Sequence, residues 1–534
     1  MDVTFTKLGF HEPETLSGLL MAFQAPEEQS KSTGSSSPIN TPPISGTLND
    51  QGKVPIADIL EQTDHGTYPK KETAYPISLA SLEILNSYSN LSRRLSGSSA
   101  VKQSTHVDPP IGGEKKLSTE EVMRIAGEQY LTTGENLSSP SIRDSSKLSH
   151  LTKEDVKNIE LANLLLSSAE KISNQQYDRA KRLLMVCDFE SSPVGNPVQR
   201  LVFHFADALW ERAERETGMK SLKPEYIERE ADVDKALRGY HPVVLAIYQA
   251  VPFGKLVQFT ASQVIIGALD SATKIHVIDL EPRTGMQWTI LMQSLSERSE
   301  YPVEHLKITM VGDSTGKMEE TGTRLLNFAK TLKLPLVFKL ITVSNVEQDM
   351  REELFELDVE ESVAVLAPMV LRTMLVKPHC LEKMIRVIRN LCPDIMVLTE
   401  VEGKHNSPSF VNRFIEVLFY YSAYFDSLDA FMEAADPNRL AMEGTLMASA
   451  VRNMIAREGG ERIMRHVGLD TWRLFLNRVG FEEVEVSEDA LYQAKLIVKS
   501  YNHAESVSLE MNGKSLTIGW KGTPLHSVSA WRCF

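Results

Sequence analysis

The spacing of apolar residues along this chain changes near residue 256. Between Thr152 and about residue 255, apolar side chains recur every three or four positions, as they do in amphipathic helices that pack on one another. From about residue 256 onward, short β-branched runs alternate with helical stretches. Alternating strands and helices form parallel sheets that helices cover on both faces. We therefore predict an α/β core, residues 256–534, beneath an α-helical cap, residues 151–255.

Individual segments carry the strand or helix pattern clearly. Strands are predicted at residues 274–278, 306–311, 336–343, 362–366 and 395–398. Helices are predicted at residues 262–269, 318–332, 381–391, 409–421, 472–479 and 491–498, with an irregular or helical insertion at 427–460. The last pattern is a hairpin in SVSLEMNGKSLTIGW, where Asn512 and Gly513 suit a type I′ turn. The parallel sheet is thus expected to finish with antiparallel strands.

The strand predicted at 274–278 is the segment around which the rest is expected to be organised. Ile275, Val277 and Ile278 give it the pattern of a strand buried on both faces. Asp279 follows at its carboxyl end, and Gly285 supplies a turn before the next helix. Ligands of open α/β sheets bind at the carboxyl ends of the strands. The loop from residue 279 to 287 is therefore the default functional site.

The region before residue 151 has a different composition. Residues 1–116 are rich in Ser, Thr, Pro and Gly, and their apolar residues are too sparse to offset the entropy of ordering, which predicts a mostly disordered segment. Ser118 and Glu121 form a capping box, so a short helix is expected there, with a polar linker completing residues 117–150.

Charge and cysteine content narrow the classes of function. The formal net charge is −14 and the pI about 5.5, so nucleic-acid phosphates are repelled on average and a DNA contact would need a local basic patch. The four cysteines lack the CxxC spacing of metal sites or the density of a disulfide scaffold, which suits a reducing compartment. No apolar run has the length of a membrane span, so a soluble intracellular protein without membrane contact is predicted.

Acidic residues at strand ends raise the hypothesis of an enzyme. Asp279 follows the first strand and Asp313 the second, where nucleotide-binding sheets hold ribose hydroxyls. A parallel sheet with a terminal hairpin also resembles methyltransferases that use S-adenosylmethionine, and we keep such an enzyme as the alternative. The loop DLEPRTGMQ lacks the glycine-rich turn by which backbone approaches a cofactor. Helix caps and loop acids are the favoured roles for these two residues.

A second polar cluster follows the strand at 395–398. Glu400, Glu402, His405 and Asn406 have the side chains of an acid–base or metal site. The sequence provides neither a third ligand nor a nucleophile, so we favour a structural role, with Asn406 or Ser407 capping the next helix. HExxH, GxSxG and Walker motifs are absent. We predict no catalytic residue, no metal and no cofactor.

Several blocks of residues 151–534 resemble, in the same order, the segments of the plant GRAS family. The two leucine-rich regions of that family are similar to LANLLLSSAEKISNQQYDRAKRLL with NPVQRLVFHFADAL, and to ETGTRLLNFAKTLKLPLVF. The block that the family names VHIID is similar to IHVIDLEPRTGMQW, and later blocks are similar to EVEGKHNSPSFVNRFIEVLFYYSAYFDSLDA and LTIGWKGTPLHSVSAWRC. The residues that carry the VHIID-like block are His276, Val277, Ile278, Asp279, Gly285, Gln287 and Trp288. Those of the terminal block are Trp520, Ser529, Ala530, Trp531 and Arg532.

The resemblance implies a Rossmann-like, methyltransferase-related sheet under a helical cap, and a nuclear regulator of transcription rather than an enzyme. It implies partner contacts, with DNA-binding transcription factors and other GRAS proteins in homo- or heterodimers, through the leucine-rich helices. The candidate contact residues are Leu161, Leu164, Leu165, Ile172, Leu325 and Phe328. Leucines at this spacing are more often core than contact. The pentapeptide of the DELLA branch is absent, so we place the chain outside that branch.

Two further expectations accompany the resemblance. Trp531 and Arg532 are predicted to stabilise the edge of the sheet. Direct DNA contact is left open, because a folded surface can gather distant basic residues such as Arg283 and Arg298, but the net charge favours an adaptor that DNA-binding partners carry to promoters.

Overall fold

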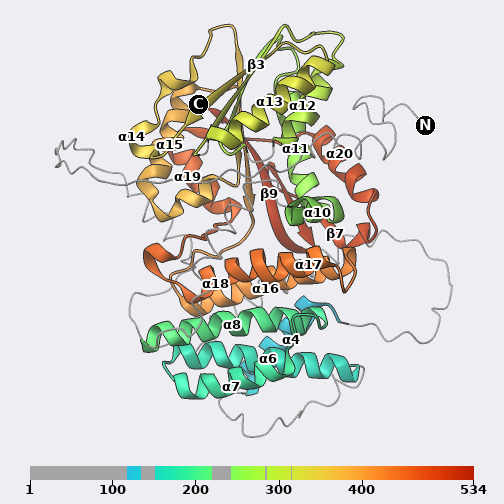
Figure 1. Cartoon of the computed structure of the whole chain (residues 1–534), viewed down its shortest axis with the longest axis vertical. Coiled ribbons are helices and arrows are strands. Elements are labelled where there is room, and N and C mark those ends of the chain that lie inside the picture. The colour runs from blue at the N-terminus through green and yellow to red at the C-terminus, as the bar shows by residue number, and fades with distance from the viewer. Residues whose placement is uncertain (1–116, 134–150, 219–241, 283–284, 314) are drawn as a thin grey trace, which may run out of the picture.

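The computed structural model describes residues 117–133, 151–218, 242–282, 285–313 and 315–534. The predicted disordered segment 1–116, the linker at 134–150 and Arg283 lie outside the described residues. Within them the chain forms a layer of helices stacked against the end of an α/β unit (Figure 1). The predicted combination of a helical cap with a Rossmann-like sheet is therefore confirmed.

The sheet of the α/β unit has nine strands in the order β3-β2-β1-β4-β5-β9-β8-β7, with β6 also paired to β9. The strands in chain order are β1 Lys274–Asp279, β2 His305–Gly312, β3 Leu336–Thr342, β4 Ser362–Pro368, β5 Ile395–Val401, β6 Phe481–Val484, β7 Val507–Asn512, β8 Ser515–Trp520 and β9 Thr523–Cys533. β1 to β5 pair in parallel, whereas β9 is antiparallel to β5, β6 and β8. The expected antiparallel end of a parallel sheet is thus present.

Helices cover both faces of this sheet, and each face has its own apolar core. In chain order, the first face is covered by α11 Phe253–Ala268, α12 Met286–Ser296, α13 Thr315–Thr331 and α20 Glu488–Lys499, and the second by α14 Val346–Asp349, α15 Pro378–Leu391 and α19 Leu469–Arg478. Neighbouring residues of β1 point to opposite cores, because Val277 belongs to the first cluster and Ile278 to the second. This explains why β1 is apolar at successive positions.

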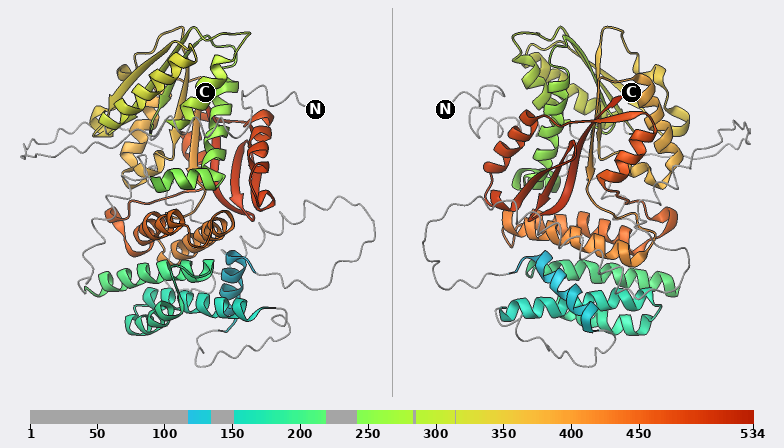
Figure 2. Two further views of the ribbon diagram at one scale, coloured as in Figure 1. Left: turned by 45° about the vertical axis from the view of Figure 1, so that its right-hand side comes forward. Right: turned by 180° about the vertical axis from the view of Figure 1, so that it is seen from behind.

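The helical cap is built from two separate parts of the chain. In chain order its helices are α4 Thr119–Thr133, α6 Lys153–Ser173, α7 Tyr177–Glu190, α8 Pro197–Thr217, α16 Phe410–Phe431, α17 Pro437–Ala441 and α18 Ala448–Ala456. Figure 2 shows α16 and α18 between α8 and the sheet, with α6 and α7 farthest from the sheet. Local capping signals set the starts of two of these helices. Ser118 and Glu121 exchange backbone-to-side-chain hydrogen bonds of 2.7 and 3.2 Å, and Asn196 caps α8 as the sequence suggested.

The cap therefore differs in composition from the predicted segment 151–255. α16 to α18 come from the region assigned to the α/β core. α4, expected as a separate short helix, joins the cap because the backbone N–H of Thr119 donates to Asp426 Oδ1 of α16 at 3.2 Å. Such packing between distant segments is not encoded in local periodicity.

Near the carboxyl end the predicted hairpin is present, but its turn was predicted wrongly and one short strand was missed. Asn512 pairs with Ser515, so the turn residues of the β7–β8 hairpin are Gly513 and Lys514. Only Gly513 of these two has a positive φ, 61°, which is the pattern of a type II′ rather than a type I′ turn. The short strand β6, sequence FEEV, was not foreseen.

No single helix among the described residues is both long and apolar enough to cross a membrane. α10 Pro242–Ala250 and α11, which meet at 80°, reach that length and apolarity only when they are taken together.

Candidate functional site

The loop after β1 encloses a buried carboxylate. Asp279 is fully buried, and its Oδ2 accepts hydrogen bonds from Trp288 Nε1 at 2.6 Å and from Gln287 Nε2 at 3.0 Å. Its Oδ1 accepts from the backbone N–H of Glu281 at 3.1 Å. Burial raises the pKa of Asp279 to about 7. Asp279 was expected to be a helix cap or a loop acid, but it is the last residue of β1, and Gly285 occupies the N-cap of α12.

Gly285 is required by the geometry of this turn. Its φ is 67°, and a Cβ atom at this position would lie 2.6 Å from the Cγ2 atom of Thr321 in α13. A side chain here would therefore combine backbone strain with a steric clash against the neighbouring helix. The turn lets α12 begin at once, so that Gln287 and Trp288 point back to Asp279.

The remaining residues of the VHIID-like block lie inside β1. His276 is buried, with Nε2 at 2.8 Å from Thr309 Oγ1 of β2 and Nδ1 at 3.2 Å from Glu361 Oε2. Burial, followed by the charge of Lys307, lowers the pKa of His276 to about 3, so the imidazole is neutral near pH 7. The block thus forms the central strand and a closed turn, in which the carboxylate of Asp279 and Nε2 of His276 are hydrogen-bonded within the protein.

The predicted contact residues of the first leucine-rich region face inward. Leu161, Leu165 and Ile172 of α6 are 4%, 0% and 1% exposed and belong to the apolar core, whereas Leu164 is half-buried. In the second region Leu325 of α13 is 1% exposed and Phe328 is half-buried against the same core. Partner binding by these helices stays a prediction. In this conformation Leu161, Leu165, Ile172 and Leu325 are not accessible to a partner.

The terminal block lies in the interior of the sheet. β9 pairs with β5 on one side and with β8 and β6 on the other, so the prediction that Trp531 and Arg532 stabilise a sheet edge was wrong about the place. Trp531 is 0% exposed and its Nε1 donates to Ser529 Oγ at 2.9 Å, and Ala530 beside it is also fully buried. Arg532 is exposed, and its Nε donates to the carbonyl of Asp394 at 3.1 Å.

Trp520 at the end of β8 links the sheet to the cap. Its ring is 1% exposed, and its Nε1 donates to Asp426 Oδ2 of α16 at 2.7 Å. Asp426 also accepts from Thr119 of α4, so one carboxylate connects the terminal block to two cap helices.

The polar cluster at the end of β5 is engaged in contacts within the protein. Glu400 Oε1 accepts from the backbone N–H of Arg372 at 3.2 Å, and Glu402 accepts from that of Leu469 at 3.1 Å. His405 Nδ1 lies 2.8 Å from Nδ1 of His466, and burial lowers the pKa of His405 to about 3. The N-cap of α16 is Ser409 rather than Asn406 or Ser407. Among the described residues no group of three His, Cys, Asp or Glu side chains is placed to hold a metal.

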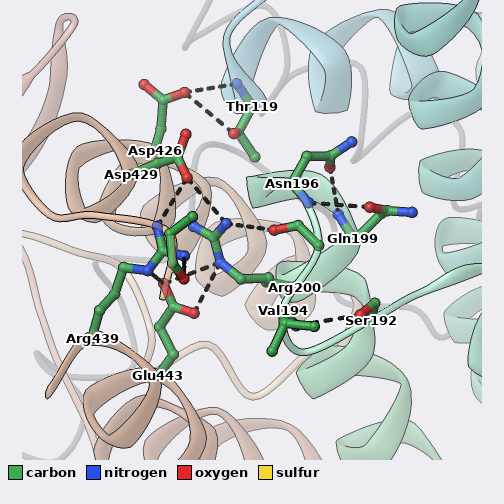
Figure 3. A network of polar contacts seen from close by, with 12 residues as sticks. Thr119, Ser192, Val194, Asn196, Gln199, Arg200, Asp426, Asp429, Arg439 and Glu443 are labelled. Atoms are coloured by element: carbon green, nitrogen blue, oxygen red, sulfur yellow. Dashed lines mark hydrogen bonds and ion pairs between the residues drawn. The ribbon is translucent and has the colours of Figure 1, made fainter. Parts of the chain in front are cut away.

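A buried ionic network that sequence reasoning missed joins the two parts of the cap (Figure 3). Arg200 of α8 is 1% exposed and donates through Nε to Glu443 at 2.9 Å and through Nη1 to Asp429 at 3.1 Å. Arg439 of α17 donates to the same Asp429 oxygen at 3.1 Å. Glu443 belongs to a π-helical turn, Met442–Met447, between α17 and α18. The partners lie far apart in sequence, so no local pattern could have revealed them.

An exposed apolar strip on α7 was also missed. Met185, Val186 and Phe189 are 64%, 42% and 86% exposed, and Val194 just after the helix is 65% exposed. The inward face of α7 is formed by Ala180, Leu184 and Cys187. The sequence signal was available, because the strip consists of apolar residues that lie off this inward face.

Comparison with known proteins identifies the chain. A model of the GRAS domain family matches residues 161–532. The chain belongs to the GRAS family. DELLA protein RGL1 of Arabidopsis thaliana is 31% identical over 376 residues, which are 70% of each protein, and DELLA protein GAIP of Cucurbita maxima is 30% identical over 380 residues. The latter match spans 70% of this chain but 62% of the pumpkin protein.

A solved structure agrees with this assignment. The crystal structure of SCL7 from Oryza sativa is 28% identical in sequence, with a TM-score of 0.61 over 70% of this chain and 99% of the rice chain. GRAS proteins are plant transcriptional regulators, and both the family and its fold were predicted from the sequence blocks.

Proposed function

We propose that this GRAS protein is a nuclear regulator of transcription that acts by protein–protein contact, as an adaptor for DNA-binding transcription factors and as a homo- or heterodimer. Membership of the family supports the regulatory role. The net charge of −14 supports an adaptor, because phosphate backbone is repelled on average. Hormone-triggered degradation is not part of the proposal, since the sequence lacks the DELLA pentapeptide.

The exposed apolar strip on α7 is the observation that supports a protein–protein contact surface. Single exposed apolar side chains are ordinary on a protein surface, but Met185, Val186 and Phe189 share the face of α7 opposite its buried residues. α7 lies at the far side of the cap from the sheet (Figure 1). An inward leucine face cannot bind a partner without opening the cap. The outer face of α7 needs no such opening.

We assign this α7 face to pairing with a second GRAS cap. Arg179 and Arg182 are exposed near the amino end of α7, and Glu190 is exposed at its carboxyl end. A twofold axis places two copies of one helix antiparallel, so that the arginines of one copy face the glutamate of the other around a shared apolar centre. The face is therefore complementary to itself in both charge and polarity.

The experiment for dimerisation is light scattering coupled to gel filtration on the full chain. The wild type is expected to be a dimer, and Met185→Glu with Phe189→Glu is expected to be a monomer with an unchanged melting temperature, because both side chains are exposed. Leu474→Glu is the matched control, since Leu474 of α19 is 55% exposed and lies on the opposite part of the molecule. A monomeric wild type, or a double variant that remains dimeric, would reject the α7 face.

A second variant distinguishes partner binding by the leucine-rich helices from a purely structural role of their leucines. Leu165→Ala is expected to lower stability by about 2–5 kcal/mol because Leu165 is fully buried. A Leu165→Ala protein that keeps its melting temperature but no longer binds a partner would show that the leucine-rich helix contacts the partner directly.

Regulation itself is tested by fusing the full chain to an unrelated DNA-binding domain and measuring a reporter gene. A change in reporter output beyond that of the DNA-binding domain alone is expected, and a fluorescent fusion should enter the nucleus. An unchanged reporter would contradict the adaptor role.

A further inference from the structure

A pocket lies where the carboxyl ends of the parallel strands meet the cap. Its volume is about 240 Å³. The ends of β4 and β5 contribute Leu366 and Thr399, α11 contributes Val257, Gln258 and Ala261, and Tyr424 of α16 closes it from the cap side. This is the place at which open α/β sheets bind ligands. Side chains of the VHIID-like block occupy the inside of the turn after β1, whereas the pocket beside this turn is open.

Two residues of this mostly apolar lining carry a side-chain polar atom that is enclosed and has no hydrogen-bond partner. Thr399 is 2% exposed, and its Oγ1 makes no hydrogen bond within the protein. Oε1 of Gln258, also buried, has none either. Leaving a buried polar atom unpaired costs free energy, so a rotation that turns either side chain toward the pocket is favoured by a ligand that offers it a hydrogen bond.

The backbone and side chains around the pocket have two further features of binding sites. Met369, which follows β4, has a φ of 56°, an uncommon value for a residue other than glycine, and its N–H donates to the carbonyl of Thr399 at 2.7 Å. Strained backbone of this kind is concentrated at functional sites. Met442, which also lines the pocket, begins the π-helical turn, and π-helical turns are likewise frequent at functional sites.

The chemistry of the lining defines the ligand. Among the described residues that line the pocket, none is Lys or Arg, and Glu281 contributes a carboxylate. The described lining therefore offers an anionic ligand no Lys or Arg side chain. Oε1 of Gln258 accepts a hydrogen bond, and the hydroxyl of Thr399 can both donate and accept. A cavity of about 150 Å³ holds benzene, so this pocket holds a molecule somewhat larger than one aromatic ring.

We propose that this pocket binds an uncharged, largely apolar small molecule that carries a hydroxyl or N–H donor directed at Gln258 and Thr399. The assignment goes beyond the proposed regulatory function and does not depend on the α7 face. S-Adenosylmethionine, which is charged and highly polar, belongs to a different class of ligand.

The first test uses 1-naphthylamine, an uncharged fluorescent probe with two fused rings and an N–H donor, titrated into the full chain. Saturable binding with Kd in about the micromolar range is expected. Ala261→Leu places extra atoms in the pocket and should weaken binding about tenfold or more. Ala268→Leu, the same substitution on the same helix outside the pocket lining, is the matched control and should bind as the wild type does.

A second control tests whether the probe binds to the exposed apolar strip on α7 instead of the pocket. The Met185→Glu, Phe189→Glu protein is expected to bind the probe normally, and Ala261→Leu is expected to remain a dimer. The two proposals therefore fail separately. Probe binding that is lost in the α7 variant, or unchanged in a folded Ala261→Leu protein, would overturn the pocket assignment.

The second test defines the ligand class by displacement of the probe. 1-Naphthol is expected to displace it about fivefold better than naphthalene, because only naphthol donates to Gln258. Gln258→Leu with Thr399→Val should abolish this preference while leaving the affinity for naphthalene unchanged. Thr399→Val by itself should leave the melting temperature unchanged or higher, since the lost hydroxyl has no partner. Displacement by 1-naphthoate or by S-adenosylhomocysteine at least as strong as that by naphthol would overturn the proposed class.

Discussion

The indole Nε1 of Trp288 donates a 2.6 Å hydrogen bond to Oδ2 of Asp279, and neither side chain reaches solvent. Because this bond joins the first turn of α12 to the end of β1, Trp288→Phe should lower the free energy of unfolding by about 2–4 kcal/mol. Urea denaturation measures this change. Trp210→Phe is the control, since Trp210 makes a similar 2.8 Å bond to Asp188 at the surface and its loss should cost under about 1 kcal/mol. Equal losses of unfolding free energy in the two variants would show that burial does not strengthen the contribution of the Trp288–Asp279 bond.

The same carboxylate predicts a pH dependence of stability. Burial raises the pKa of Asp279 from 3.8 to about 7, so between these values the folded protein keeps a proton that the unfolded chain has lost. The stabilisation is complete below about pH 4 and is lost as the pH rises through about 7, by roughly 4 kcal/mol in total.

Asp279→Asn isolates this group, because an amide does not ionise. The free energy of unfolding of the wild type minus that of the variant should fall between pH 4 and pH 7.5. Burial also raises the pKa of Glu402 to about 7, but this contribution is common to both proteins and cancels. A difference that stays flat across this range would show that Asp279 is ionised throughout.

The ionic network of the cap predicts an asymmetry between buried and exposed pairs. Glu443→Gln leaves the guanidinium of Arg200 buried with less compensating charge and should cost about 3–5 kcal/mol. Glu382→Gln is the matched change in an exposed pair with Arg386 on α15, where a cost below about 1 kcal/mol is expected. Thermal unfolding of both variants decides this, and similar costs would mean that the network is not coupled to cap stability.

The terminal block predicts opposite behaviour for adjacent residues. Trp531→Ala should cost about 3–5 kcal/mol, because the fully buried ring leaves a cavity beneath β9. Arg532→Ala should cost under about 1 kcal/mol, since its side chain is exposed and makes one backbone contact. Denaturation midpoints of the two variants test this. A severe effect at Arg532 would point to a role other than stability.

Selection from a random DNA duplex pool distinguishes an adaptor from a direct reader. Purified full chain is expected to enrich no motif at physiological salt, in line with its net charge of −14. Enrichment that declines steeply with added salt would instead establish direct binding through phosphate contacts.

Sequence reasoning succeeded where the signal is local. β1 is recognisable because it is β-branched and buried on both faces, and the caps at Ser118 and Asn196 depend on residues three positions apart. The whole-block resemblance then supplied the arrangement of the strands, which periodicity alone does not contain.

The features that sequence reasoning missed depend on contacts between distant segments. Leucines at helical spacing look the same whether they face a partner or the protein's own core, and only packing shows that Leu165 is enclosed. α16 to α18 belong to the cap because Arg200 and Glu443 meet across the fold. The pocket brings together Gln258 of α11 and Thr399 of β5, and no local sequence pattern predicts that these two residues are neighbours.

The position of β9 has a consequence for synthesis of the protein. β9 fills the slot between β5 and β8, yet it emerges from the ribosome after every other described strand. Until then β5 keeps an open hydrogen-bonding edge beside an incomplete core, a state that invites pairing with other chains. Folding of the α/β unit must therefore finish after translation of residues 523–533, and we expect the nascent chain to depend on chaperones that shield the edge of β5 in the meantime.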